Sequence, residues 1–198
     1  MWSGSGHGAH DAVETYGELG TPSAASLGGV TFLELQSRSD DHFAWGRRYY
    51  AKGGFFGTIS ADAISLITAS VAQAPTADCE IYVLQLGGAV ADVADEATAY
   101  TGRLAGYYWI VEPVWDDPAD DTRCLTWGRG TAAQLSALSM SGNYVNEQSD
   151  TGGDASLRAY GAPTYARLAA LKYRLDPDNL FRLNQNLTPT PRQDPART

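Results

Sequence analysis

Apolar residues recur at two spacings along this chain, and the spacing separates expected strands from expected helices. Alternation of apolar and polar positions is typical of a half-buried strand, whereas recurrence every three to four residues is typical of a helix. Alternating or β-branched and aromatic runs predict strands at Val30–Gln36, Arg47–Phe56, Glu80–Leu86, Ala89–Val93, Gly106–Trp115 and Gly142–Glu147. Helical spacing predicts helices near residues 60–74, 119–138 and 163–175.

Local signals indicate where the predicted helices begin and end. Ser60 can cap the first of them, whose apolar stripe would be Ile64, Ile67 and Val71. Asp176-Pro177 ends the last one, because proline disfavours the helical conformation in the residue before it.

The predicted strands and helices are segregated along the chain rather than strictly alternating. This order predicts an α+β fold, in which helices cover a mainly antiparallel sheet of about five to seven strands. We expect one such domain at residues 28–189. Residues 1–27, rich in Gly, Ser, Ala and Pro, and the tail at 190–198 are expected to be flexible.

The last predicted helix and the segment after it carry a more specific pattern than periodicity. Tyr165-Ala166-Arg167-Leu168 and Lys172 are followed by Asp176-Pro177-Asp178-Asn179-Leu180-Phe181 and by Asn184-Gln185-Asn186-Leu187-Thr188-Pro189. This series resembles the C-terminal signature of berberine bridge enzyme-like proteins, which are flavin-linked oxidases of the vanillyl-alcohol oxidase superfamily. Other segments resemble the same family: Leu33–Gln36, Arg47–Phe55, Leu84–Val90, Ala97–Arg103 and Tyr144–Asn146.

The resemblance implies that residues 28–189 are a substrate-binding region of the fold class expected above. Family members carry a flavin-binding domain ahead of this region, with a histidine and often a cysteine that bond covalently to the flavin. We expect this chain to lack that domain and to bind no cofactor by itself. The alternative is FAD held by a flavin domain that lies on another chain or was removed.

Composition narrows the range of partners. The chain of 198 residues has 14 Lys and Arg against 23 Asp and Glu, and its net charge of −9 repels nucleic acids and anionic membranes. No apolar run approaches the roughly 20 residues that span a bilayer. The first residues lack the features of a secretory signal, so we expect a cytoplasmic protein. Cys79 and Cys124 are expected to be buried free thiols, and no metal site is expected.

Three residues are candidates for catalysis: Glu147, Glu112 and Tyr144. Tyr144-Val145-Asn146-Glu147 matches a family strand that often supplies a catalytic residue, although Glu147 stands where the family has an aromatic residue. Alternation along a strand would place Tyr144 and Asn146 on one side and Glu147 on the other. Glu112 would be a useful acid if buried, because desolvation raises the pKa of a carboxylic acid.

Five residues are candidates for contact with the substrate: Gln85, Tyr108, Ile110, Asn146 and Arg48. Each candidate has a structural alternative. Glu147 can be a solvated carboxylate, the aromatic residues can be core, Gln85 can pair with a sheet edge, and Arg48 can form a surface ion pair.

Three functions fit these features. We favour a flavin-independent cyclase that closes a ring, without redox chemistry, on a hydrophobic natural-product intermediate, because such a reaction needs a shaped pocket and few polar groups. The second hypothesis is a substrate-binding domain or subunit of an FAD-dependent oxidoreductase, and the third is a small-molecule binding protein without turnover. We also expect a homodimer that covers the sheet face left open by the missing domain.

Overall fold

The computed structural model describes residues 17, 18, 20, 21, 28–183 and 185–190. The segments that were expected to be flexible, residues 1–27 and 190–198, lie largely outside the described ranges. The chain divides into two compact units, Met1–Asp41 and His42–Thr198. No helix in the described ranges is long and apolar enough to cross a membrane.

The described part of the first unit contains a short helix where a strand was predicted. Helix α2 spans Phe32–Gln36, and Thr31 and Glu34 form a reciprocal capping box at its start. The Thr31 amide donates to the Glu34 carboxylate over 2.7 Å, and the Glu34 amide donates to the Thr31 hydroxyl over 3.2 Å. The strand prediction for Val30–Gln36 is therefore wrong, because this cap satisfies backbone donors at a helix start.

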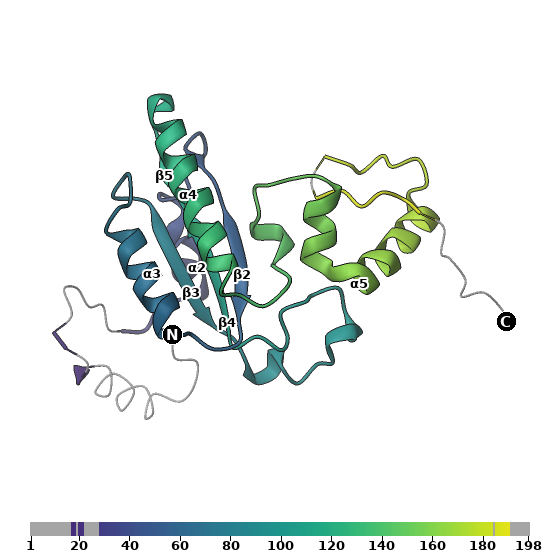
Figure 1. Ribbon diagram of the computed structural model, residues 1–198, viewed down its shortest axis with the longest axis horizontal. Coiled ribbons are helices and arrows are strands. Elements are labelled where there is room, and N and C mark those ends of the chain that lie inside the picture. The colour runs from purple at the N-terminus through teal and green to yellow at the C-terminus, as the bar shows by residue number, and fades with distance from the viewer. Residues whose placement is uncertain (1–16, 19, 22–27, 184, 191–198) are drawn as a thin grey trace. The chain divides into compact units, whose positions relative to one another are not determined.

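The second unit is built on two small antiparallel sheets, which confirms the predicted α+β class (Figure 1). Strands β2 (Lys52–Phe56), β4 (Tyr107–Glu112) and β3 (Glu80–Gln85) form one sheet with β4 in the centre. Strands β1 (Arg48–Tyr49) and β5 (Val114–Trp115) form the other. Pro113 separates β4 from β5, because proline has no amide to donate to a neighbouring strand.

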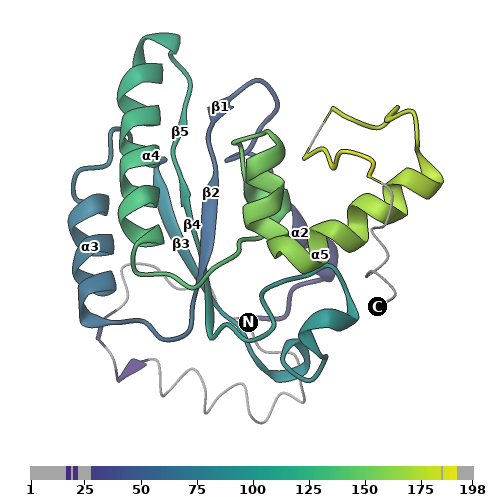
Figure 2. The same cartoon turned by 45° about the vertical axis from the view of Figure 1, so that its right-hand side comes forward.

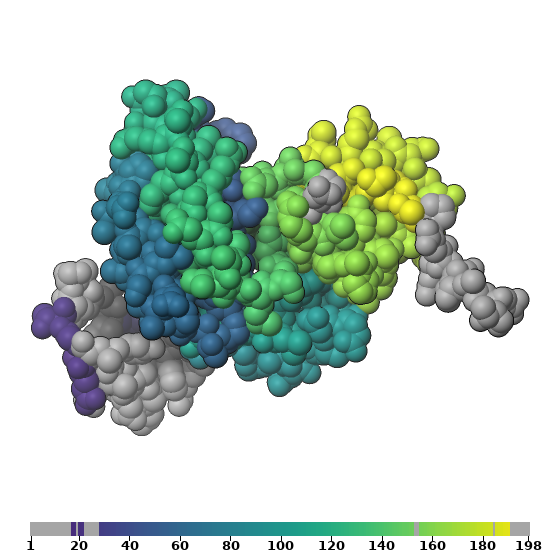
Figure 3. Space-filling model, viewed as in Figure 1, coloured from purple at the N-terminus to yellow at the C-terminus, as the bar shows by residue number. Residues whose placement is uncertain are grey.

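Helices α3 (Ala61–Val71) and α4 (Asp121–Ser136) cover one face of the larger sheet. In the space-filling view their side chains form a continuous layer over it (Figure 3). The core beneath them centres on Phe56, Trp109 and Leu135, which are almost completely buried. Each such side chain contributes about 1.5–3 kcal/mol to folding.

The start of α3 is as predicted, but its buried face is not. The Ser60 hydroxyl accepts from the Ala63 amide over 3.1 Å. Ile64 and Val71 are 55% and 45% exposed, whereas Ala63 is buried and Ile67 packs against the core. The apolar stripe is thus rotated by one position from the predicted one.

Helix α5 (Gly153–Leu175) closes the chain on the β2 side of the larger sheet, away from α3, in both ribbon views (Figures 1 and 2). It bends at Gly161, whose positive φ of 71° favours glycine. Asp176 ends the helix as predicted, and its carboxylate accepts from Lys172 over 2.6 Å and from the Leu180 amide over 2.7 Å.

Two further strand predictions are wrong. Ala89–Val93 does not continue β3, because Gly87 and Gly88 have φ of 126° and 51° and turn the chain into a 3-10 helix at Gly88–Val90. The segment Gly142–Glu147 is a loop that ends in a 3-10 helix at Val145–Glu147. A hydrogen bond from the Asn143 amide group to the Gln148 side chain closes this loop on itself.

Candidate functional site

The face of the larger sheet opposite α3 and α4 brings together most of the candidate residues. We call it the open face and define it by its side chains from the three strands: Phe55, Glu80, Tyr82, Leu84, Tyr108, Ile110 and Glu112. Register pairs Tyr108 with both Phe55 and Leu84, and pairs Glu112 with Glu80. Tyr82 and Leu84 are 49% and 44% exposed, so the β3 side of this face is apolar and accessible.

Two loops place aromatic side chains over the rest of the open face. The Tyr108 ring lies 5.4 Å from the Phe55 ring and 6.3 Å from the Tyr144 ring, measured between centroids. Tyr100 lies edge-on to both Phe55 and Tyr144, at 6.2 and 6.0 Å. These separations are typical of packed aromatic rings, so the four residues form one rigid aromatic wall.

Glycine at position 53 allows the Tyr108 phenol to lie close against β2. A Cβ atom at Gly53 would stand 2.6 Å from Cζ of Tyr108 and would collide with its hydroxyl. The Tyr108 hydroxyl is buried and makes no hydrogen bond of normal geometry with the described residues. Burial, followed by the charge of Glu147, raises the pKa of Tyr108 far above its usual range, so the phenol stays protonated.

Glu112 is the acid of the open face with the most perturbed ionisation. Burial, assisted by the negative charges of Glu80 and Glu147, raises its pKa to about 7. A carboxylic acid with this pKa exchanges a proton readily near neutral pH and can act as a general acid or base.

Tyr144, Asn146 and Glu147 come from the loop and not from a strand. The Asn146 side chain donates to the Tyr144 hydroxyl over 2.8 Å. The negative charge of Glu147 raises the pKa of both Tyr108 and Glu112, so Glu147 lies near the open face. Tyr144 packs against Tyr108 on that same face. The predicted separation of Tyr144 from Glu147 onto opposite sides is therefore wrong, because the 3-10 turn does not alternate as a strand does.

Two predicted contact residues lie away from the open face. Gln85 pairs with Tyr107, so it points to the face that α3 and α4 cover. Arg48 is bound to Asp121 by two hydrogen bonds of 2.6 Å. Ile110 is on the open face but only 4% exposed, which makes it part of the core beneath the surface.

Several residues of the site were not among the candidates, including Glu80, Tyr100 and Arg103. The Arg103 guanidinium lies 5.4 Å from the centroid of the Tyr100 ring and donates to the Val90 carbonyl and the Thr98 hydroxyl. Tyr100 and Arg103 belong to the Ala97–Arg103 segment whose family resemblance was noted, and that signal could have identified them.

Comparison with known proteins gives the same family. Residues 143–188 match the family model described as "Berberine and berberine like". An FAD-linked oxidoreductase of Dictyostelium discoideum is 26% identical over 192 residues, which are 96% of this chain and 41% of the relative. An uncharacterized FAD-linked oxidoreductase of Bacillus subtilis is 31% identical over 135 residues, 66% of this chain and 29% of the relative.

Solved structures agree at the level of the fold. The crystal structure of aclacinomycin oxidoreductase matches 94% of this chain and 43% of its own, with a TM-score of 0.69 and 20% sequence identity. This chain thus spans about two fifths, or less, of the proteins that it matches.

Proposed function

We propose that the chain forms the substrate-binding part of a berberine bridge enzyme-like FAD-linked oxidoreductase. The match of residues 143–188 to the berberine family model and the similarity to part of the length of FAD-linked oxidoreductases support this proposal. The open face would hold the reacting group of the substrate. The observation that carries this proposal is the position of Glu112, an acid with a pKa of about 7, beside an aromatic wall on a partly accessible sheet face.

The substrate class follows from the surface chemistry of the open face. Its wall is aromatic and apolar, and three carboxylic acids, Glu80, Glu112 and Glu147, outnumber the one cation of the site, Arg103 over the Tyr100 ring. Such a surface favours a hydrophobic molecule and repels an anionic one. We therefore propose a hydrophobic small molecule with a hydroxyl or amine whose proton can pass to a carboxylate.

Each polar group can be given a role in that reaction. Ionised Glu112 would accept the proton of the substrate hydroxyl or amine. Tyr144, which the Asn146 side chain orients, would donate a hydrogen bond to an oxygen of the substrate. Tyr108, whose buried hydroxyl stays protonated, would support the aromatic wall from beneath. Glu147 would act through charge, because its repulsion keeps both Tyr108 and Glu112 in their protonated forms to higher pH.

The described residues fit FAD only in part. A flat ring system could lie against Tyr82 and Leu84, whose side chains are half exposed. A pyrophosphate does not fit beside Glu80, Glu112 and Glu147, because like charges repel at short range. In the proposed enzyme FAD would be the electron acceptor. The residues of this chain would bind the substrate and accept its proton.

A cytoplasmic location is proposed on separate grounds. The sequence has two cysteines, and both Cys79 and Cys124 are buried free thiols, which is usual where the environment is reducing.

The mass of the metabolite that accumulates when the gene is deleted tests the proposal. An oxidoreductase predicts a precursor two hydrogens heavier than the product. A precursor of equal mass with one ring fewer would contradict the proposal and support the flavin-independent cyclase instead. If no precursor accumulates, the chain would be a binding protein without turnover.

A further inference from the structure

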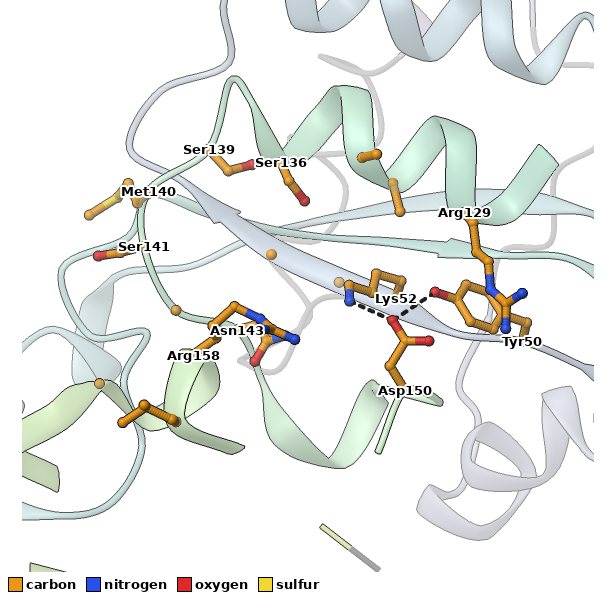
Figure 4. A pocket seen from close by; sticks show the side chains of 17 residues that line it. Tyr50, Lys52, Arg129, Ser136, Ser139, Met140, Ser141, Asn143, Asp150 and Arg158 are labelled. Carbon is orange, nitrogen blue, oxygen red and sulfur yellow. Dashed lines mark hydrogen bonds and ion pairs between the residues drawn. The ribbon is translucent and has the colours of Figure 1, made fainter. Parts of the chain in front are cut away.

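A second concave site lies at the free edge of strand β2, apart from the open face. Its cavity of about 690 Å³ is open to solvent and is lined by β2, α4, the loop after α4 and the first half of α5 (Figure 4). We call it the edge cavity. Its size is within the range of about 300–1,000 Å³ that is usual for small-molecule sites.

The charged side chains that line the edge cavity are mainly cations. Lys52 from β2, Arg129 from α4 and Arg158 from α5 face a single described carboxylate, Asp150. This balance is opposite in sign to that of the whole chain, whose net charge is −9. A concave surface lined by one sign of charge concentrates its potential on the space that it encloses.

Lys52 is the cation that Asp150 neutralises. The Lys52 ammonium donates to the Asp150 carboxylate over 2.6 Å, and the Tyr50 hydroxyl donates to the same oxygen over 3.2 Å. Burial alone would raise the pKa of Asp150, but these bonds and the positive charges of Lys52 and Arg129 hold the pKa below its usual range. Asp150 is therefore ionised at neutral pH and saturated by partners.

The two arginines have no such partner among the described residues. Arg129 stacks its guanidinium 5.4 Å from the centroid of the Tyr50 ring, and neither it nor Arg158 takes part in the described ion pairs. A guanidinium presents a planar set of donors that matches a carboxylate or a phosphate. Arg129 lies beside Tyr50 and Arg158 beside Asn143, on two different helices, so an anionic ligand that fills the edge cavity could contact both (Figure 4).

The backbone of β2 adds an amide to the same wall. Ala51 and Phe55 direct their backbone groups outward, because the Ser149 amide donates to the Ala51 carbonyl over 2.9 Å and the Met140 amide donates to the Phe55 carbonyl over 2.8 Å. Gly53 lies midway between them and has the same orientation in the strand. The described backbone provides no partner for the outward amide of Gly53, and this residue lines the edge cavity.

We propose that the edge cavity binds an anionic small molecule, whose carboxylate or phosphate oxygens are held by Arg129, Arg158 and the Gly53 amide. The hydroxyl of Ser136 on the α4 side would bond a polar group on the rest of the molecule. This site takes an anion, whereas the open face repels one, so it does not depend on the function proposed above.

Titration of the ¹⁵N-labelled chain tests this proposal, with inorganic phosphate in one series and succinate in the other at constant ionic strength. We expect saturable shifts of the Gly53 amide signal with at least one anion. Saturation by phosphate alone, or by succinate alone, identifies which oxyanion the site prefers. Absence of saturable shifts with both anions would overturn the proposal.

Matched variants distinguish specific binding in the edge cavity from the general electrostatic attraction of anions to any arginine. Loss of a hydrogen bond between charged groups predicts that R129Q and R158Q each weaken binding by about tenfold or more. R174Q removes the same charge from α5 outside the cavity and should leave the affinity unchanged. Equal weakening in R174Q and R158Q would contradict a specific site.

Discussion

The ionisation of Glu112 depends on two acidic neighbours that two other segments of the chain supply. Glu112 lies on β4, Glu80 on β3 and Glu147 in the loop before α5. The sequence could indicate that a buried Glu112 would have a raised pKa. It could not indicate which neighbouring acids would contribute to that rise. That depends on the register of β3 against β4, which is set by tertiary packing.

The raised pKa of Glu112 predicts a specific dependence of stability on pH. The carboxyl loses its proton near its ordinary value of 4.5 in the unfolded chain and near 7 in the folded one. The folded state therefore binds more protons between these values, and the free energy of unfolding should fall by up to about 3 kcal/mol as pH rises through this window. Glu112→Gln should remove this fall, as measured by urea denaturation at a series of pH values.

An exposed glutamate provides the control for that experiment. Glu96→Gln changes the same charge in a loop and should retain the parent's fall in stability between pH 4.5 and 7. If Glu112→Gln has the same pH dependence as the parent, Glu112 is not perturbed as described.

The hydroxyl of Tyr108 predicts an unusual response to removal. Because this buried group lacks a well-formed hydrogen bond with the described residues, Tyr108→Phe should change the free energy of unfolding by no more than about 1 kcal/mol, and it can be stabilising. Tyr50→Phe removes a hydroxyl that donates to Asp150 and should destabilise by about 1 kcal/mol or more. Chemical denaturation of both variants would contradict this expectation if Tyr108→Phe were the more destabilising one.

The limits of sequence reasoning at single residues are clear from Gln85 and Arg48. Gln85 was a candidate either for contact with the substrate or for pairing at a sheet edge, and its pairing with Tyr107 turns it to the other face. Arg48 was a candidate for substrate contact with a surface ion pair as its alternative, and its two hydrogen bonds to Asp121 depend on the position of a residue 73 places further along the chain.

Secondary structure was predictable where long periodic runs existed. The central strands, the helices α3 and α4 and the second half of α5 follow from apolar spacing and from caps such as Ser60. The first half of α5, which begins at Gly153, was not predicted. The sequence Thr31-Phe32-Leu33-Glu34 is itself a capping-box pattern, so the helix α2 was available from the sequence and was overlooked in favour of alternation. The loop at Gly142–Glu147 was not predictable in this way, because side-chain bonds of Asn143 and Gln148 hold it.

The pairing of β2 with β4 requires glycine at position 54. A Cβ atom there would stand 2.6 Å from Cζ2 of the Trp109 indole, which is fully buried. We therefore predict that Gly54→Ala destabilises the chain by about 1–3 kcal/mol through overpacking. Gly130→Ala in α4 meets no atom within 4 Å and should instead stabilise by about 0.5–1 kcal/mol. Denaturant titration of the two variants would refute this if both shifted the midpoint in the same direction.

For the whole molecule, the family resemblance predicted the fold class, because its motifs extend through most of the chain. The division of the strands into two small sheets was not predictable, since it follows from the break at Pro113 and from pairings between distant segments. The edge cavity was not predicted either, because Lys52, Arg129 and Arg158 are far apart in sequence and meet only in the folded chain.

The accessible β3 side of the open face predicts self-association of the isolated chain. Tyr82 and Leu84 would be buried by a second copy, and a specific interface requires at least about 1,000 Å² in total. We propose that the isolated chain forms a homodimer, which light scattering would detect. We expect Leu84→Glu to convert this dimer to a monomer. Leu138→Glu, at an equally exposed position after α4, should leave the dimer intact. A monomeric parent chain at all accessible concentrations would contradict this proposal.

The role of the open face in oxidation can be measured in cells whose only copy of the gene carries Glu112→Gln. With the protein present at the parent's level, we predict that the product falls by about 100-fold or more, as is typical for loss of a general base, and that a precursor two hydrogens heavier accumulates. Glu96→Gln should give the parent's product level. Unchanged product in the Glu112→Gln cells, or a precursor equal in mass to the product, would contradict oxidation of the substrate at this face.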